Sequence, residues 1–82
     1  MTDAEILERL NGVVSDTLDL DTVSLQPSTT AADVDGWDSL AHIQIIVAIE
    51  RSFGIRLRVG EMASIANVGE LVSRIATRLN AR

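Results

Sequence analysis

Apolar residues recur at helical spacing in three segments of this chain, and the first lies near the N-terminus. Its apolar residues come every three or four positions, between charged ones: Ile6, Leu7, Leu10, Val13, Val14 and Leu18. Thr2 and Glu5 match a capping box, in which a hydroxyl and a carboxylate each accept from a backbone N–H of the first turn. The pattern therefore predicts a helix from about Asp3 to Asp16.

No helical period is present from Asp19 to Asp35, a stretch rich in Asp, Ser and Thr with one proline. Val23 and Leu25 alternate with polar residues, which predicts an extended segment that places two apolar side chains on the core. Loops of this length are uncommon in compact domains and usually serve a function. We therefore expect a long first loop with a functional role.

The most apolar segment lies between Asp38 and Gly54 and predicts a second helix. Asp38 matches an N-cap, and Gly54 matches the residue that ends many helices in a left-handed conformation. Many residues between them are β-branched, which favours a strand. However, about fifteen residues without a turn signal suit a helix better than a strand of about five or six.

On a helix, the apolar residues of this segment form two stripes. The first consists of His42, Ile45, Ile46, Ile49 and Phe53. The second consists of Leu40, Ile43 and Val47, with Ala41 and Gln44 beside it. Because one stripe is enough to build a core, we expect the second to lie exposed as an apolar patch.

The last part of the chain predicts an extended piece, a short helical turn and a closing helix. Apolar and basic residues alternate over residues 55–59, and Met62 and Ile65 fit one helical turn. Asn67 and Glu70 match a second capping box. The helical period then continues through Val68, Leu71, Val72, Ile75, Ala76 and Leu79. Three arginines suit the C-terminal end of this helix, where the dipole favours cations: Arg74, Arg78 and Arg82.

These elements predict an all-α fold, a small four-helix bundle of three main helices and one short helix, in a single domain spanning residues 1–82. Cysteine is absent and 46% of the residues are hydrophobic, so the core must provide the stability. The sequence contains no run of about 18 apolar residues, the length that would predict a membrane-spanning helix. The acidic N-terminus does not resemble a signal peptide, and we expect a cytoplasmic protein.

Charge is unevenly distributed. Residues 1–50 hold ten acidic residues against Arg9 alone, a formal charge of −9, whereas residues 51–82 hold two acidic residues and six arginines, a charge of +4. An acidic front repels nucleic acid and attracts basic partners. The basic rear lacks the aromatic residues of a nucleic-acid platform, so we set nucleic-acid binding aside. The net charge of −5 favours a monomer.

Ser39 lies at the expected start of the second helix and is the main candidate for chemistry. An Asp-Ser pair before an apolar run is often only a cap. His42 could approach Ser39 as a general base, but no third residue is placed to orient the imidazole, so we prefer a structural histidine to a hydrolase. Asp33, Asp35 and Asp38 lack EF-hand spacing, and we expect no metal site.

The stretch from Gly36 through Trp37, Asp38 and Ser39 to Leu40 resembles the attachment motif of the acyl carrier protein family, whose hallmark is Asp-Ser-Leu at the start of the second helix. The resemblance extends over nearly the whole order of helices and loops. It implies a carrier rather than an enzyme, with a 4′-phosphopantetheine arm from coenzyme A on Ser39 that holds acyl or aminoacyl groups as thioesters.

The resemblance also implies particular partners and contacts. A phosphopantetheinyl transferase would recognise Asp38 and attach the arm, with Trp37 and Leu40 beside it. Acyl-loading and acyl-processing enzymes would dock on the apolar stripe Leu40, Ile43 and Val47. Charged contacts to these enzymes would come from Asp33, Asp35 and Glu50. For Trp37, a role in fastening the start of the helix is an equal alternative.

Two departures from the usual carriers of fatty-acid synthesis indicate a specialised pathway instead, in lipid, polyketide, peptide or related biosynthesis. Trp37 replaces the usual small residue before the Asp-Ser pair, and Ala41 and Gln44 stand where acidic residues are common. The alternative function is a small helical interaction module that uses the Leu40, Ile43 and Val47 face without any prosthetic group.

Overall fold

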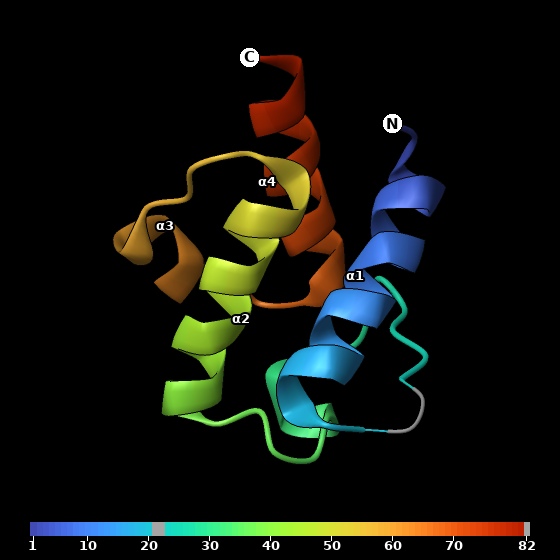
Figure 1. Ribbon diagram of the computed structural model, residues 1–82, viewed down its shortest axis with the longest axis vertical. Helices are drawn as coiled ribbons and strands as arrows, with labels where there is room; N and C mark the ends of the chain where they lie inside the picture. The colour runs from blue at the N-terminus through green and yellow to red at the C-terminus, as the bar shows by residue number, and fades with distance from the viewer. Residues whose placement is uncertain (21–22, 82) are drawn as a thin grey trace.

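Four α-helices form the computed structural model, which describes residues 1–20 and 23–81. They are α1 (Asp3–Leu18), α2 (Ser39–Phe53), α3 (Val59–Ala63) and α4 (Val68–Asn80), with a 3₁₀ turn, η1 (Ala31–Asp33), in the loop after α1. No strand occurs in these residues. The prediction of an all-α bundle with three main helices and one short helix is confirmed (Figure 1). No described helix has the length and apolar character needed to span a membrane.

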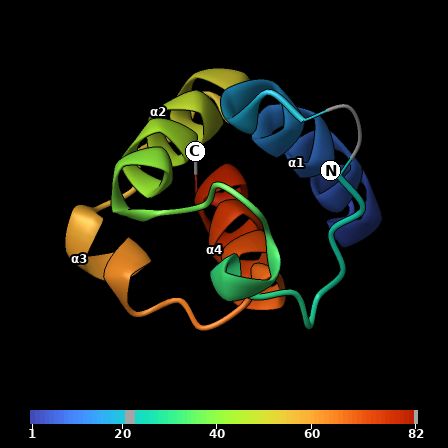
Figure 2. The ribbon, with the colours of Figure 1, turned by 90° about the horizontal axis from the view of Figure 1, so that it is seen from below.

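The three main helices enclose one core. α1 and α2 run side by side in opposite directions, and α1 also packs against α4 (Figure 1). Seen from below, α4 lies across the space between α1 and α2, and α3 lies on the far side of α2 from α1 (Figure 2). The start of α1 and the end of α4 lie at the end of the bundle opposite the start of α2 (Figure 1).

Local capping signals set the ends of α1. The Thr2 N–H donates to Oε1 of Glu5 over 2.8 Å, and the Glu5 N–H donates to the Thr2 hydroxyl over 3.2 Å, so the predicted capping box is confirmed. The helix continues to Leu18, two residues beyond the predicted end. It ends where Asp19 adopts a left-handed conformation (φ 55°) and the Leu20 N–H still bonds to the Ser15 carbonyl.

The buried residues come from every helix and from two connecting segments. Leu25 is buried and Val23 half-buried, which confirms that the first loop places these two apolar side chains on the core. After α2, Ile55 and Leu57 are buried while Arg56 is exposed, as the alternating pattern predicts. The largest fully buried side chains are Ile6, Leu10, Ile45, Ile49, Met62, Ile75 and Val14.

Several details of the last third differ from the predictions. Val59 begins α3 instead of ending the extended piece, because Arg58 is the N-cap in an extended conformation. Ile65 lies beyond α3 and is only half-buried. The capping box at α4 is incomplete, because the Glu70 carboxylate accepts from the Ala66 N–H and not from the Asn67 N–H. Arg82 lies outside the described residues.

Hydrogen bonds hold the long first loop against two helices. The Leu25 N–H donates to Oδ1 of Asn11 on α1 over 2.8 Å. The Val68 and Gly69 N–H groups, at the start of α4, donate to the carbonyls of Thr29 and Pro27 over 2.8 and 2.9 Å. A Cβ at residue 69 would lie 3.1 Å from the Pro27 carbonyl oxygen, so glycine permits this close approach. These hydrogen bonds to α1 and α4 therefore fix the position of the loop that leads to the start of α2.

Candidate functional site

Ser39 is the first residue of α2, and its side chain is exposed. Its N-cap, Asp38, accepts the Ala41 N–H on Oδ1 and the His42 N–H on its carbonyl, each over 2.8 Å. The Ser39 hydroxyl and the N–H groups of Ser39 and Leu40 have no hydrogen-bond partner among the described residues. A free hydroxyl thus lies beside free amides at the positive end of the helix dipole.

The chain reverses just before this serine. Oδ2 of Asp33 accepts the Thr30 N–H over 3.0 Å and closes the turn around η1. Gly36 has a φ of 85°, a conformation that side chains rarely adopt, and it turns the chain toward α2. Asp33, Asp35 and Asp38 are all exposed near the start of α2. The loop therefore gathers negative charge around Ser39.

Trp37 and His42 form a contact that the sequence pattern does not reveal. The indole N–H of Trp37 donates to Nδ1 of His42 over 3.1 Å, and both side chains are half-buried. Since Nδ1 accepts, the proton of the neutral imidazole lies on Nε2. A serine hydrolase needs a carboxylate at Nδ1 to orient its histidine, and here an indole donor occupies that position. His42 is half-buried, as expected, and its bond to Trp37 agrees with the structural role that we prefer.

The Trp37–His42 pair covers a small cavity. Its other walls come from the first loop, α3 and the start of α4, including Met62, Ile65 and Leu71. The cavity volume is about 40 Å³. At this size, the cavity would have to widen before it could hold an acyl chain of several carbons.

The second apolar stripe of α2 is exposed, as predicted. Leu40 is 66% exposed, Ile43 56% and Val47 41%, whereas Ile45 and Ile49 on the other face are fully buried. They follow Ser39 along one side of the helix. Unpartnered apolar residues in a row are typical of a docking surface.

Two residues near the stripe are more buried than the sequence indicated. Ala41 is buried and not beside the patch, because it shares a helix face with the fully buried Ile45 and Ile49. Glu50 is half-buried, and its Oε2 accepts the Leu57 N–H over 2.9 Å. Glu50 thereby holds the segment that follows α2 against the helix.

Residues 8–75 match the family model described as the phosphopantetheine attachment site. This chain belongs to the acyl carrier protein family. It is 32% identical to the acyl carrier protein of Acidothermus cellulolyticus over 72 residues, which cover 88% of this chain and 86% of the relative. It is 33% identical to that of a Picosynechococcus species over 78 residues, covering 94% and 95% of the two chains.

The fold leads to the same family. The solution structure of the holo acyl carrier protein from Geobacter metallireducens superposes with a TM-score of 0.85 at 33% identity, covering 93% of this chain and 87% of that one. The protein is therefore a carrier and not an enzyme, and its cofactor is covalently bound 4′-phosphopantetheine. The exposed hydroxyl beside free amides fits the phosphodiester of this group.

Proposed function

We propose that this acyl carrier protein holds acyl or aminoacyl groups as thioesters on a 4′-phosphopantetheine arm attached to Ser39. The main support is the position of Ser39, the exposed first residue of α2, whose hydroxyl has no intramolecular partner in the described part of the chain. Attachment there leaves every described hydrogen bond of the helix start intact. The arm supplies the thiol chemistry that the side chains of this cysteine-free protein do not contain.

The neighbours of Ser39 have distinct proposed roles. The free amides of Ser39 and Leu40 favour the negative phosphodiester through the helix dipole. Asp38 caps the helix with one carboxylate oxygen and helps a phosphopantetheinyl transferase and its metal ion to recognise the site. Trp37 fastens the loop to the first turn through His42, beside the arm.

The proposed partners are the transferase and the enzymes that load and process the cargo. They dock on Leu40, Ile43 and Val47, whose apolar area is available for burial. The exposed carboxylates of Asp33 and Asp35 pair with basic residues of these enzymes. Glu50 offers them only the carboxylate oxygen that does not hold the Leu57 N–H.

We also propose that the pathway is a specialised one and that the carrier is a cytoplasmic monomer with a single domain. The support for the pathway is Trp37 before the motif and the absence of acidic side chains at Ala41 and Gln44 on α2. The narrow apolar stripe and the net charge of −5 support the monomer. Sedimentation equilibrium measures the oligomeric state, and thioester formation with acyl-loading and aminoacyl-loading enzymes distinguishes the pathways.

Intact mass tests the attachment site directly. The apo protein is incubated with coenzyme A, Mg²⁺ and a broad-specificity phosphopantetheinyl transferase, together with Ser39→Ala. Ser52→Ala is a matched control, because Ser52 is an exposed serine on the same helix. Wild type and Ser52→Ala are expected to gain one phosphopantetheine and release adenosine 3′,5′-bisphosphate, whereas Ser39→Ala gains none.

Two outcomes would contradict this assignment. Modification of Ser39→Ala would place the arm on another residue. No modification of a folded wild type, with a dedicated transferase and an active control carrier, would favour an interaction module that uses the same apolar stripe without an arm.

A further inference from the structure

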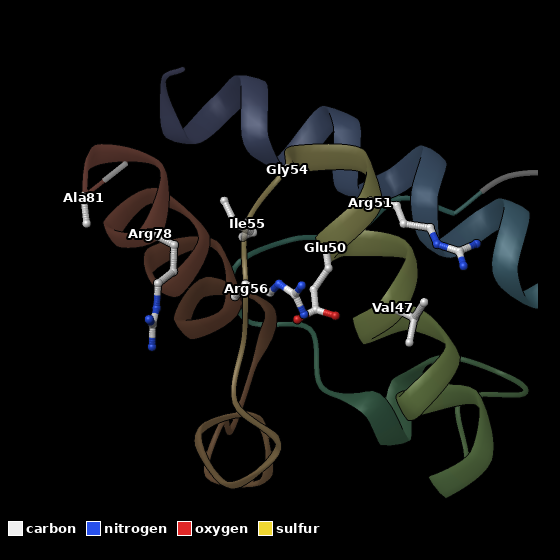
Figure 3. A pocket seen from close by; sticks show the side chains of 8 residues that line it. All are labelled: Val47, Glu50, Arg51, Gly54, Ile55, Arg56, Arg78 and Ala81. Atoms are coloured by element: carbon white, nitrogen blue, oxygen red, sulfur yellow. The ribbon is translucent and has the colours of Figure 1, made fainter.

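A groove of about 650 Å³ lies at the end of α2 opposite to Ser39. Its lining residues include Val47, Arg51, Gly54, Arg56, Arg78 and Ala81. Figure 3 shows α2 on one side of the groove and α4 on the other, with the segment that follows Gly54 between them. Because Val47 also belongs to the exposed stripe, the groove continues the apolar patch that starts beside Ser39.

The groove carries a net positive charge. Arg51 and Arg56 are exposed, and neither makes an ion pair or a hydrogen bond within residues 1–20 and 23–81. Arg78 forms an ion pair with Glu61, so its charge is largely neutralised. Glu50 also lines the groove and keeps its negative charge while its Oε2 accepts the Leu57 N–H. Arg51 and Arg56 together outweigh this one carboxylate, so the end of α2 keeps a net positive charge.

Opposite charges thus flank one apolar stripe. The carboxylates of Asp33, Asp35 and Asp38 lie near the start of α2, and the guanidinium groups of Arg51 and Arg56 lie near its end. A docking surface with charge of one sign does not fix which way a partner faces, whereas two signs at opposite ends favour only one orientation.

We propose that this groove binds an acidic segment of a partner enzyme. The carboxylates of that segment lie opposite Arg51 and Arg56. The same docking face carries basic residues opposite Asp33 and Asp35. The planar donors of a guanidinium match a carboxylate in a two-bond geometry. The occupant is a protein segment and not nucleic acid, because the groove contains no aromatic residue on which a base could stack. This inference rests on the carrier function, since that function requires docking to enzymes.

A peptide titration tests the groove. The probe is a synthetic amphipathic peptide of Leu and Glu residues, and the control is the same peptide with Gln in place of Glu. Each is added to isotope-labelled apo protein, and backbone NMR shifts are followed at several salt concentrations. The acidic peptide is expected to shift the resonances of Val47, Arg51 and Arg56, with an affinity that falls as salt rises.

Matched arginine variants connect the binding to the groove. Arg56→Glu is expected to lower the affinity for the acidic peptide by about tenfold, because attraction becomes repulsion at the binding site. Arg74→Glu makes the same change of charge at an exposed arginine of α4 that does not line the groove, and it is expected to weaken binding by less than about twofold.

Four results would overturn the proposal. They are no binding of the acidic peptide, equal binding of the Gln peptide, equal weakening by Arg56→Glu and Arg74→Glu, and tighter binding of a single-stranded oligonucleotide than of the acidic peptide at the same salt concentration. The apo protein is used throughout, so the outcome does not depend on Ser39 modification. The peptide experiment therefore tests the groove alone, whereas failure of the mass experiment contradicts the carrier assignment on which the groove proposal rests.

Discussion

The Trp37 indole N–H donates to Nδ1 of His42 over 3.1 Å, and this bond connects the residue before the Asp-Ser-Leu motif to the first turn of α2. The ring centroids lie 6.2 Å apart with the planes inclined at 32°, so the rings are tilted and not stacked. The contact holds the end of the long loop beside Ser39. It also forms part of the wall of the small cavity behind the site.

A double-mutant cycle measures this bond. Trp37→Phe and His42→Phe each remove one partner, and the coupling free energy between them is expected to be about 0.5–1.5 kcal/mol. Urea denaturation followed by circular dichroism provides the four free energies of unfolding, because Trp37 is the only tryptophan and fluorescence would be lost. Additive effects of the two substitutions would show that the bond contributes nothing to stability.

Asp38 has two proposed roles that substitutions separate. Asp38→Ala removes the cap on the Ala41 N–H and is expected to cost about 1 kcal/mol of unfolding free energy, while Asp38→Asn keeps the cap and most of the stability. Both variants lose the carboxylate, so both are expected to accept phosphopantetheine more slowly. Denaturation curves and mass time courses measure the two effects. If Asp38→Asn were modified at the wild-type rate, capping would be the only role left for Asp38.

The two faces of α2 are expected to respond in opposite ways. Ile43→Ser, on the exposed face, is expected to change stability by less than about 0.5 kcal/mol and to raise the KM of the transferase for the carrier. Ile45→Ala, on the buried face, is expected to cost about 2–5 kcal/mol. Gln44→Ser is an exposed control outside the stripe, and an equal rise in KM for this variant would argue against docking through the stripe.

Acid is expected to loosen the start of α1. The hydrogen bond from the Thr2 backbone N–H, followed by that from the Thr2 hydroxyl, lowers the pKa of Glu5 below its ordinary value. Because the folded pKa is the lower one, the stabilisation is present above the unfolded pKa of about 4.3 and is lost as the pH falls through the folded pKa. The protection of the Glu5 and Ile6 amides, measured against the intrinsic exchange rate at each pH, is expected to fall over that range.

A matched pair of variants checks this pH effect. Glu5→Gln keeps an acceptor for the Thr2 N–H but does not titrate, so the protection of these amides is expected to lack the acid-dependent step. Glu8→Gln removes another exposed glutamate of α1 and is expected to keep that step. If both variants showed the same acid-dependent step, the step would arise from a titrating group other than Glu5.

The sequence predicts best what depends on short-range signals. Asp38 and Gly54 define α2 because capping and left-handed glycine act within one helical turn, and the exposure of Leu40 and Ile43 follows from helical spacing alone. The serine is recognisable because its motif is contiguous.

Other features depend on where distant segments meet. The carbonyls of Pro27 and Thr29 accept from the first amides of α4, about forty residues later, and no local pattern indicates that pairing. Glu50 reads as a surface charge in the sequence, but the chain after Gly54 turns back and brings the Leu57 N–H to it. The Trp37–His42 bond requires one particular pair of side-chain conformations, which spacing does not specify.

The small size of the cavity behind Trp37 and His42 has a consequence for the cargo. With about 40 Å³ available, the helices would have to move apart before the carrier could enclose a long acyl chain. Each methylene transferred from water into the apolar tunnel of an enzyme contributes about 0.8 kcal/mol, which is about a fourfold change in affinity. Every methylene already enclosed by the carrier would reduce that gain, so the widening of this cavity would set how much of the chain-length selection is left to the enzymes.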